Sequence, residues 1–389
     1  GCVTPMERVV KIAEGSAPSA ACNARESEAH WTIDDPSGPE TVESTDLIAG
    51  VSLRTQQLEP GVRLVLDDGI QDLASTDRGG WATNRIVAGH DGSVWVFSDR
   101  GFRRLGDEVV EERYMPWHAW ASDMGDRPHS ADIEVGPDGT VWWASHQEGR
   151  GHLLAYDGEE WTVRKRAGTG RVRELDIDDS GTLWASWTNG ATRTLSVGYL
   201  DESDSWRRVG AWRKSPGWSF VPGLSAAGDG EVWILLEPPE GMAVWHLADA
   251  DSKEWEPLPE PETWGSFRGV PHATSDGTMW IQYQKRKIVY FDGDDWVVFD
   301  PSDGVPKLVG WRTIPQAAPD GSFWVPVFIP VPGEERCDGV ANFDGVAWSN
   351  YLQGSCIDSM DVAPDGTLWV RAREPGGPSE VFAIRPVEA

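Results

Sequence analysis

One short pattern recurs along most of the chain and limits what it can fold into. The pattern is Asp-Gly, any residue, an apolar residue and Trp, with Ser replacing Asp in one copy. Its seven Trp residues follow one another at intervals of 47, 42, 49, 47, 44 and 45 residues. They are Trp95, Trp142, Trp184, Trp233, Trp280, Trp324 and Trp369. A period this regular indicates a repeat architecture in which each copy is one structural unit.

A second pattern lies about halfway through several copies. It consists of an aromatic residue, Asp, Gly, two further residues and Trp. It occupies Tyr156–Trp161, Phe291–Trp296 and Phe343–Trp348, and looser versions end at Trp206 and Trp255. Asp-Gly between apolar runs predicts a tight hairpin turn, because Gly accepts the positive φ that such a turn needs. Each copy therefore holds two turns and four strands, A to D, with a longer link between B and C.

Four antiparallel strands every 45 residues or so are typical of a β-propeller blade, and stacked blades bury one another's faces. We therefore predict an all-β fold, a seven-bladed β-propeller with four-stranded antiparallel blades over residues 56–389. The last copy ends after its third strand, so we expect an N-terminal strand at 61–66 to complete that blade and close the ring. Residues 1–55 are rich in Pro, Ser, Glu and Ala, which is typical of a flexible tail or tether.

The charge of the chain excludes several classes of partner. The 34 Lys and Arg against 63 Asp and Glu leave a net charge of −29. A field of this sign repels nucleic acid and anionic lipid, so we expect neither as a partner. One basic cluster stands out: Arg164, Lys165, Arg166, Arg171 and Arg173. We interpret it as protection of an outer strand against edge pairing, with attraction of a carboxylate or sulfate group as the alternative.

The four cysteines suggest an oxidising compartment. Cys337 and Cys356 fall on the same loop face in adjacent blades, so we predict a disulfide between them. Cys2 follows Gly1, as in the mature end of a bacterial lipoprotein, and a lipid on Cys2 would be the only membrane attachment. A disulfide between Cys2 and Cys22 is an alternative. We therefore expect an extracellular or cell-surface location.

The repeats resemble a known family. Asp-Gly-Thr-Leu-Trp-Val at 365–370 and Tyr-Asp-Gly-Glu-Glu-Trp-Thr-Val at 156–163 are similar to two-component regulator propeller repeats. That resemblance implies a non-enzymatic sensing or binding module, often one that recognises saccharide-like ligands. Gly-Pro-Asp-Gly-Thr-Val-Trp at 136–142 is similar to the repeats of streptogramin B lyase, another bacterial propeller. The catalytic His and Glu of that lyase have no matching positions in this chain.

Six of the seven predicted innermost strands have a polar residue at the position four residues before the Asp-Gly or Ser-Gly pair, and the first strand has Val87 there. Apolar neighbours flank this position in every copy, and this alternation predicts one side chain per blade in a central channel. The seven residues are Val87, Glu134, Asp176, Ser225, His272, Gln316 and Asp361. Glu134, Asp176 and Asp361 are also candidates for a weak Ca²⁺ site, since carboxylate oxygens suit this ion. A water-filled channel is the alternative, and we expect no other cofactor.

Ligand-binding candidates lie in the variable D–A and B–C loops, which share one face of a propeller. Trp beside Arg suits stacking on sugar rings or flat organic ligands. The candidates are Trp120, Trp218, Trp264, Arg268, Trp311 and Arg312, with Trp187 and Trp212 nearby in the chain. Packing of these Trp side chains under their own loops is the alternative.

Three functions are consistent with these observations. The first is an exported, non-enzymatic module that binds a saccharide, a small organic molecule or a protein at the loop face. The second is a lyase or hydrolase with acid/base residues near the channel. The third is a structural subunit of a cell-surface assembly.

Overall fold

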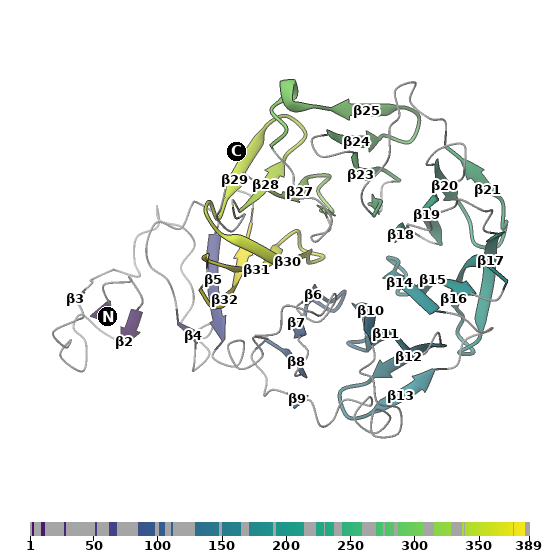
Figure 1. The fold of residues 1–389 in the computed structure, drawn as a ribbon, viewed down its shortest axis with the longest axis horizontal. Helices are drawn as coiled ribbons and strands as arrows, with labels where there is room; N and C mark the ends of the chain where they lie inside the picture. Colours follow the sequence, from purple (N-terminus) through teal and green to yellow (C-terminus); the bar gives the residue numbers. More distant parts are fainter. Residues whose placement is uncertain are drawn as a thin grey trace.

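The chain forms a ring of seven four-stranded sheets around a central axis (Figure 1). The computed structural model describes residues 2–3, 9–11, 27–28, 51–52, 62–67, 85–97, 101–105, 110–111, 129–147, 150–164, 171–189, 192–213, 223–228, 230–236, 243–258, 270–274, 277–283, 287–306, 315–327, 337, 339–375 and 377–385. The predicted seven-bladed β-propeller is confirmed. Among the described residues no helix is long and apolar enough to cross a membrane.

The strands of each blade pair antiparallel in chain order, from the axis outward (Figure 1). Blade 1 holds β6 (Arg85–Ala88), β7 (Val94–Phe97), β8 (Gly101–Arg104) and β9 (Val110–Glu111). Blade 2 holds β10 (His129–Val135), β11 (Val141–Gln147), β12 (Arg150–Tyr156) and β13 (Trp161–Arg164). Blade 3 holds β14 (Arg171–Ile177), β15 (Leu183–Asn189), β16 (Thr194–Leu200) and β17 (Trp206–Arg213). Blade 4 holds β18 (Gly223–Ala227), β19 (Glu231–Leu236), β20 (Ala243–Leu247) and β21 (Trp255–Pro257).

The remaining blades repeat this order. Blade 5 holds β22 (His272–Ala273), β23 (Met279–Tyr283), β24 (Lys287–Phe291) and β25 (Trp296–Phe299), followed by a short 3-10 turn at Pro301–Asp303. Blade 6 holds β26 (Gln316–Ala317), β27 (Phe323–Pro326), β28 (Val340–Phe343) and β29 (Trp348–Tyr351). Blade 7 holds β30 (Cys356–Val362), β31 (Leu368–Arg373) and β32 (Ser379–Ile384).

An N-terminal strand closes the ring, as the sequence predicts. β5 (Val62–Asp67) pairs with β32 as the fourth strand of blade 7, with Val65 opposite Val381 and Val62 opposite Ile384. β4 (Val51–Ser52) pairs with the outer side of β5 and adds a fifth strand. A separate small sheet near the N-terminus joins β1 (Cys2–Val3), β2 (Val9–Lys11) and β3 (Ser27–Glu28).

The Asp-Gly pairs form the predicted turns. In the A–B turns the Gly adopts positive φ, for example +80° at Gly139, and the Asp side chain accepts the N–H of the residue two positions later. In the C–D turns the Asp carboxylate accepts two consecutive backbone N–H groups, as Asp157 does. These hydrogen bonds satisfy turn amides locally, which is why short polar side chains precede the Gly.

The one repeat without Asp in its A–B turn has a substitute two residues earlier. Asp178 accepts hydrogen bonds from the N–H and hydroxyl of Ser180 and from the N–H of Thr182. Its other oxygen accepts the indole N–H of Trp184 at 2.8 Å. Asp178 therefore accepts the backbone N–H groups of this turn, as the Asp of the Asp-Gly pair does in the other repeats.

The strand-B Trp residues fill the core between blades. Five of the seven are buried, from 0% exposure at Trp324 to 7% at Trp95, and Trp142 and Trp369 are half-buried. The Trp residues that begin β13, β17, β21, β25 and β29 pack at the margins of these clusters. The predicted disulfide between Cys337 and Cys356 is present.

We predict that the closing strand is needed for the stability of the whole ring. Replacing residues 62–67 by a Gly/Ser linker of equal length removes the pairing partner of β32 and leaves its edge open. Thermal unfolding should begin at a lower temperature, and size-exclusion chromatography should show self-association. The same replacement at residues 9–11 is the control and should leave both readouts unchanged. Equal behaviour of the two variants would contradict closure by β5.

Candidate functional site

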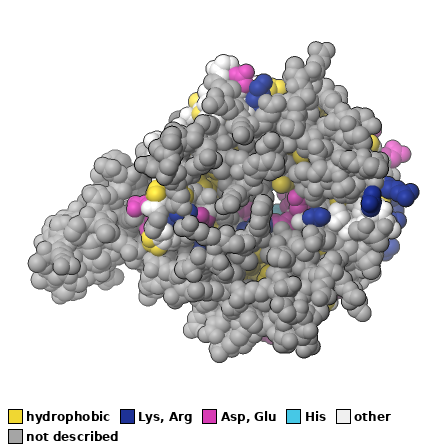
Figure 2. Space-filling view, in the orientation of Figure 1, with side chains coloured by type: hydrophobic (Ala, Val, Ile, Leu, Met, Phe, Trp, Pro, Cys, Tyr) yellow, Lys and Arg dark blue, Asp and Glu magenta, His cyan; other side chains and the backbone are white. Residues whose placement is uncertain are grey.

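The axis of the ring is lined by the innermost strands, and each carries the predicted channel position, which is polar in six blades and is Val87 in blade 1. Each of these residues pairs directly with the strand-B Trp of its own blade, from Val87 opposite Trp95 to Asp361 opposite Trp369. Glu134, Asp176, His272, Gln316 and Asp361 are half-buried, and Ser225 is buried. In the space-filling view, acidic side chains with a His beside them gather at the hollow centre (Figure 2).

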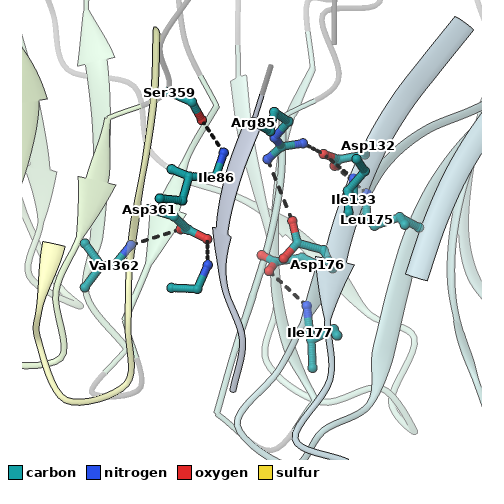
Figure 3. Close-up of polar contacts among 12 residues, drawn as sticks. Arg85, Ile86, Asp132, Ile133, Leu175, Asp176, Ile177, Ser359, Asp361 and Val362 are labelled. Carbon is teal, nitrogen blue, oxygen red and sulfur yellow. Dashed lines mark hydrogen bonds and ion pairs between the residues drawn. The ribbon is translucent and has the colours of Figure 1, made fainter. Parts of the chain in front are cut away.

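Three of these side chains bond the backbone of the next blade, and Figure 3 shows the contacts of one of them, Asp361. Asp176 Oδ2 accepts the N–H of Ala226 at 2.8 Å, which links blade 3 to blade 4. Asp361 Oδ2 accepts the N–H of Ala88 at 2.9 Å, which links blade 7 to blade 1 across the ring closure. The Oδ1 atom of each carboxylate accepts the N–H of the residue that follows it in its own strand. Both oxygens of both carboxylates are thus engaged by backbone amides.

Ser225 makes the same connection with a hydroxyl in place of a carboxylate. Its Oγ accepts the N–H of Ala273 at 3.0 Å and links blade 4 to blade 5. An innermost strand pairs on its outer side only, so every second N–H would face the axis without a strand partner. The side chains of the preceding blade supply the missing acceptors.

A second layer of acceptors lies two residues earlier on the innermost strands. In blades 2, 3 and 7 a register shift in the pairing between strands A and B precedes this residue. Such a bulge changes where the following side chains point. The three bonds run from Leu175 N to Asp132 Oδ2 (2.8 Å), from Leu224 N to Glu174 Oε2 (2.7 Å) and from Ile86 N to Ser359 Oγ (3.1 Å). We call the acceptors of both layers the inner acceptors: Asp132, Glu174, Asp176, Ser225, Ser359 and Asp361.

Arg85, on the innermost strand of blade 1, is the guanidinium that faces this acidic group (Figure 3). It donates a hydrogen bond to Asp132 Oδ1 and lies 4.0 Å from Glu134 Oε1. Burial alone would lower the pKa of Arg85, but the carboxylates of Asp132 and Glu134 outweigh it and raise that pKa. The positive charge of Arg85 therefore offsets the negative charge of more than one carboxyl group.

Burial and mutual repulsion raise the pKa of four carboxyl groups at the axis. Burial is the main cause that raises the pKa of Asp176 to about 7 and that of Asp361 to about 6. The pKa values of Glu134 and Glu174 are raised well above the usual range by burial, with repulsion from Asp132 adding to it. Near neutral pH the axis therefore contains both ionised and protonated carboxyls.

His272 is a neutral imidazole in the same channel. Burial, with a smaller effect from Arg85, lowers its pKa to about 3. Its Nε2 atom is buried and has no hydrogen-bond partner. His272 is therefore an unprotonated imidazole at neutral pH, and the charged group that acts on it is Arg85.

The arrangement gives no sign of a metal centre. Among the described residues no group of three or more His, Cys, Asp or Glu side chains is disposed to hold a metal ion. Calcium binding by Glu134, Asp176 and Asp361 stays a prediction, and the backbone contacts of Asp176 and Asp361 occupy oxygens that a cation would need.

The loop residues predicted to bind ligand lie outside the described part of the chain: Trp120, Trp218, Trp264, Arg268, Trp311 and Arg312. Trp187 and Trp212 are described and both lie in strands. Trp187 is buried at 5% exposure in β15, and Trp212 is half-buried in β17 with its ring 5.0 Å from that of Trp255. For these two, packing is the correct interpretation.

The sequence prediction missed Arg85 and the second layer of acceptors. A signal for the second layer was present, because Asp132, Glu174 and Ser359 extend the polar–apolar alternation of their strands by one further step. It appears in only three of the seven repeats, so it does not stand out as a repeat feature.

The comparisons with known proteins identify the fold. No family model matches the sequence, and no curated protein does. Among solved structures, a streptogramin B lyase has a TM-score of 0.55 at 13% identity, over 80% of this chain and 96% of that one. YCF48 bound to a D1 peptide has a TM-score of 0.43 at 16% identity, over 62% and 74% of the two chains. A gluconolactonase from Xanthomonas campestris has a TM-score of 0.41 at 12% identity, over 84% of this chain and 90% of that one. At 13% identity the likeness to the streptogramin B lyase shows a shared fold alone.

Two buried serines test the role of the inner acceptors. Ser225→Ala leaves the N–H of Ala273 without its acceptor and should lower the free energy of unfolding by about 1–2 kcal/mol. The control is Ser186→Ala, since Ser186 is equally buried (0% against 4% exposure) and its hydroxyl has no partner. That variant should be neutral or slightly more stable in denaturant unfolding. An equal loss in both would show that the contact with the next blade is unimportant.

The raised carboxyl pKa values also predict how stability depends on pH. Carboxyls in the unfolded chain have pKa values near 4, while those of Asp176 and Asp361 lie at about 7 and 6 in the fold. The folded state therefore holds more protons between about pH 4 and 7, so this contribution is complete at low pH and is lost as pH rises. Denaturant unfolding at several pH values should show stability falling over this range. Asp176→Asn should flatten the fall, and a wild-type curve that rises instead would contradict these pKa values.

Proposed function

We propose that this chain is an exported β-propeller that binds its ligand without catalysis, on the face formed by the D–A and B–C loops. The observation that carries the proposal is that the carboxylates at the axis accept backbone N–H groups of the next blade. Asp176 and Asp361 each commit both oxygens to backbone amides, and Glu174 and Asp132 also bond the next blade. Side chains that hold blades together are poorly available for a reaction that must move protons and substrate.

The disulfide between Cys337 and Cys356 supports an oxidising, exported environment. It ties the start of blade 7 to the segment that precedes strand C of blade 6, next to the loop face. Lipid attachment at Cys2 remains part of the proposal for a cell-surface location.

The ligand classes we propose are a saccharide, a small organic molecule or a protein. Trp and Arg side chains in the loops, among them Trp264 and Arg312, suit sugar rings and flat organic groups. The opposite face consists of short, uniform Asp-Gly turns whose polar groups are satisfied locally. It therefore offers little for selective recognition.

A lyase or hydrolase reaction near the axis is the second candidate function. It is favoured by the neutral imidazole of His272 and by the raised pKa of Asp176, which occupy the same position on the innermost strands of their blades. A solved propeller of this fold is a streptogramin B lyase, so conversion of a streptogramin B, followed by mass spectrometry, is the direct assay. Turnover that His272→Ala abolishes would favour the enzyme over the binding module.

Binding to a glycan array, followed by calorimetry on any positive glycan, tests the first function. Trp264→Ala and Arg312→Ala should each weaken binding by about tenfold or more, since stacking and charge contacts are worth about 1–2 kcal/mol. Val346→Ala is the control, because Val346 is 89% exposed in a C–D turn on the opposite face. Binding that is unchanged in both loop variants would show that the glycan binds elsewhere on the protein. If no glycan binds, the proposal of a saccharide ligand is wrong.

A further inference from the structure

The outermost strand of blade 3 differs from the other outer strands. β17 has eight residues, against four in β13, β25 and β29 and three in β21. It pairs with β16 on one side, and in the part of the chain that the structure describes no strand follows it in the sheet. The corresponding strand of blade 7, β5, is covered by β4. β17 is therefore a long, open strand edge with backbone groups directed outward.

A bulge and an indole from the next blade hold this edge in place. The pairing with β16 shifts register next to Val209, whose carbonyl accepts the indole N–H of Trp255 at 3.1 Å. A side chain at Gly210 would come within 2.6 Å of the Trp212 ring and 2.8 Å of the Trp255 nitrogen, so glycine is required there. Because of the bulge, Arg207 and Arg208 are both exposed instead of alternating.

Apart from Ala211, the exposed side chains of β17 are basic, although the whole chain carries a net charge of −29. Arg207, Arg208 and Arg213 are exposed on β17, and Arg193 is exposed directly before Thr194, the residue that pairs with Arg213. Arg207 is neutralised by Asp201 at 2.6 Å. Lys and Arg side chains gather at the rim of the ring where β17 lies (Figures 1 and 2).

Among the described residues the other three arginines have no ion-pair partner: Arg193, Arg208 and Arg213. We call these three residues, together with the open edge of β17, the basic edge. Of the outer strands with described side chains, β13 ends in Arg164, which pairs with Asp204, and β25, β29 and β21 carry no Lys or Arg. The unpaired positive charge is thus concentrated on the longest open edge.

We propose that the basic edge is a docking site for an extended acidic peptide segment, which adds to blade 3 as a further strand. The backbone of β17 would supply main-chain hydrogen bonds, and the three unpaired arginines would contact carboxylates of the segment. This surface is separate from the loop face and does not depend on the ligand proposed there.

Protection of the edge against aggregation is the competing explanation for these charges. Charged side chains on an edge strand discourage pairing between copies. In a chain of net charge −29, however, acidic side chains would repel other copies more strongly, while unpaired arginines attract them. The sign of the charge therefore fits recruitment of an acidic segment better than repulsion.

Two labelled peptides of equal charge test strand addition against simple attraction. The first alternates Glu and Val over eight residues and can form a strand, and the second alternates Glu and Pro and cannot supply the ladder hydrogen bonds. In fluorescence anisotropy with the full-length protein at low salt, the Glu–Val peptide should bind about tenfold or more tightly than the Glu–Pro peptide. Its affinity should fall as salt is raised.

A charge-reversed variant places the binding on the basic edge. Arg208→Glu with Arg213→Glu should weaken binding of the Glu–Val peptide by about tenfold or more. Arg104→Glu with Arg385→Glu is the control, since both arginines are exposed and lie on other blades. Unchanged thermal unfolding of both double variants establishes that they are folded. Equal affinity for the two peptides, equal loss in the two variants, or no binding of either peptide would overturn the proposal.

Discussion

The ring depends on hydrogen bonds from the innermost backbone of one blade to side chains of the blade before it. The first strand of each blade has a partner on one side only, and its other edge faces a narrow axis. Backbone N–H groups left without acceptors there would cost free energy comparable to a lost hydrogen bond. Asp132, Glu174, Asp176, Ser225, Ser359 and Asp361 provide those acceptors at four of the seven blade junctions. The bonds between blades 7 and 1 make closure of the ring part of the same system.

Lining the axis with carboxylates that bind backbone N–H groups brings like charges close together. Carboxylates accept backbone N–H groups well, but several of them in one buried channel repel one another. Arg85 relieves part of the repulsion, and raised pKa values at Asp176 and Asp361 relieve more. The axis is therefore a structural element with a titratable interior. That interpretation agrees with our two proposals, which assign molecular recognition to the loop face and to the basic edge of blade 3.

The fold could be predicted from the sequence because its determinants are local and repeated. Asp-Gly turns and the strand-B Trp need only neighbouring residues to be recognised, and the missing fourth strand of the last repeat pointed to residues 61–66. The inner acceptors of the second layer were harder to predict, because Asp132, Glu174 and Ser359 act after a bulge that single-strand alternation does not reveal. Arg85 was missed since its partners come from another blade. The basic edge depends on which arginines lack partners, as Arg208 does and Arg207 does not, and this is a property of the folded chain.

Hydrogen exchange of single backbone amides, followed by NMR, tests the central claim most directly. The account predicts that the amides of Ala88 and Ala226 exchange slowly although no strand pairs with them on that side. In Asp361→Ala the amide of Ala88 should exchange much faster while that of Ala226 keeps its protection. Unchanged protection of Ala88 in this variant, or fast exchange of both amides in the wild-type protein, would contradict the role assigned to the axial side chains.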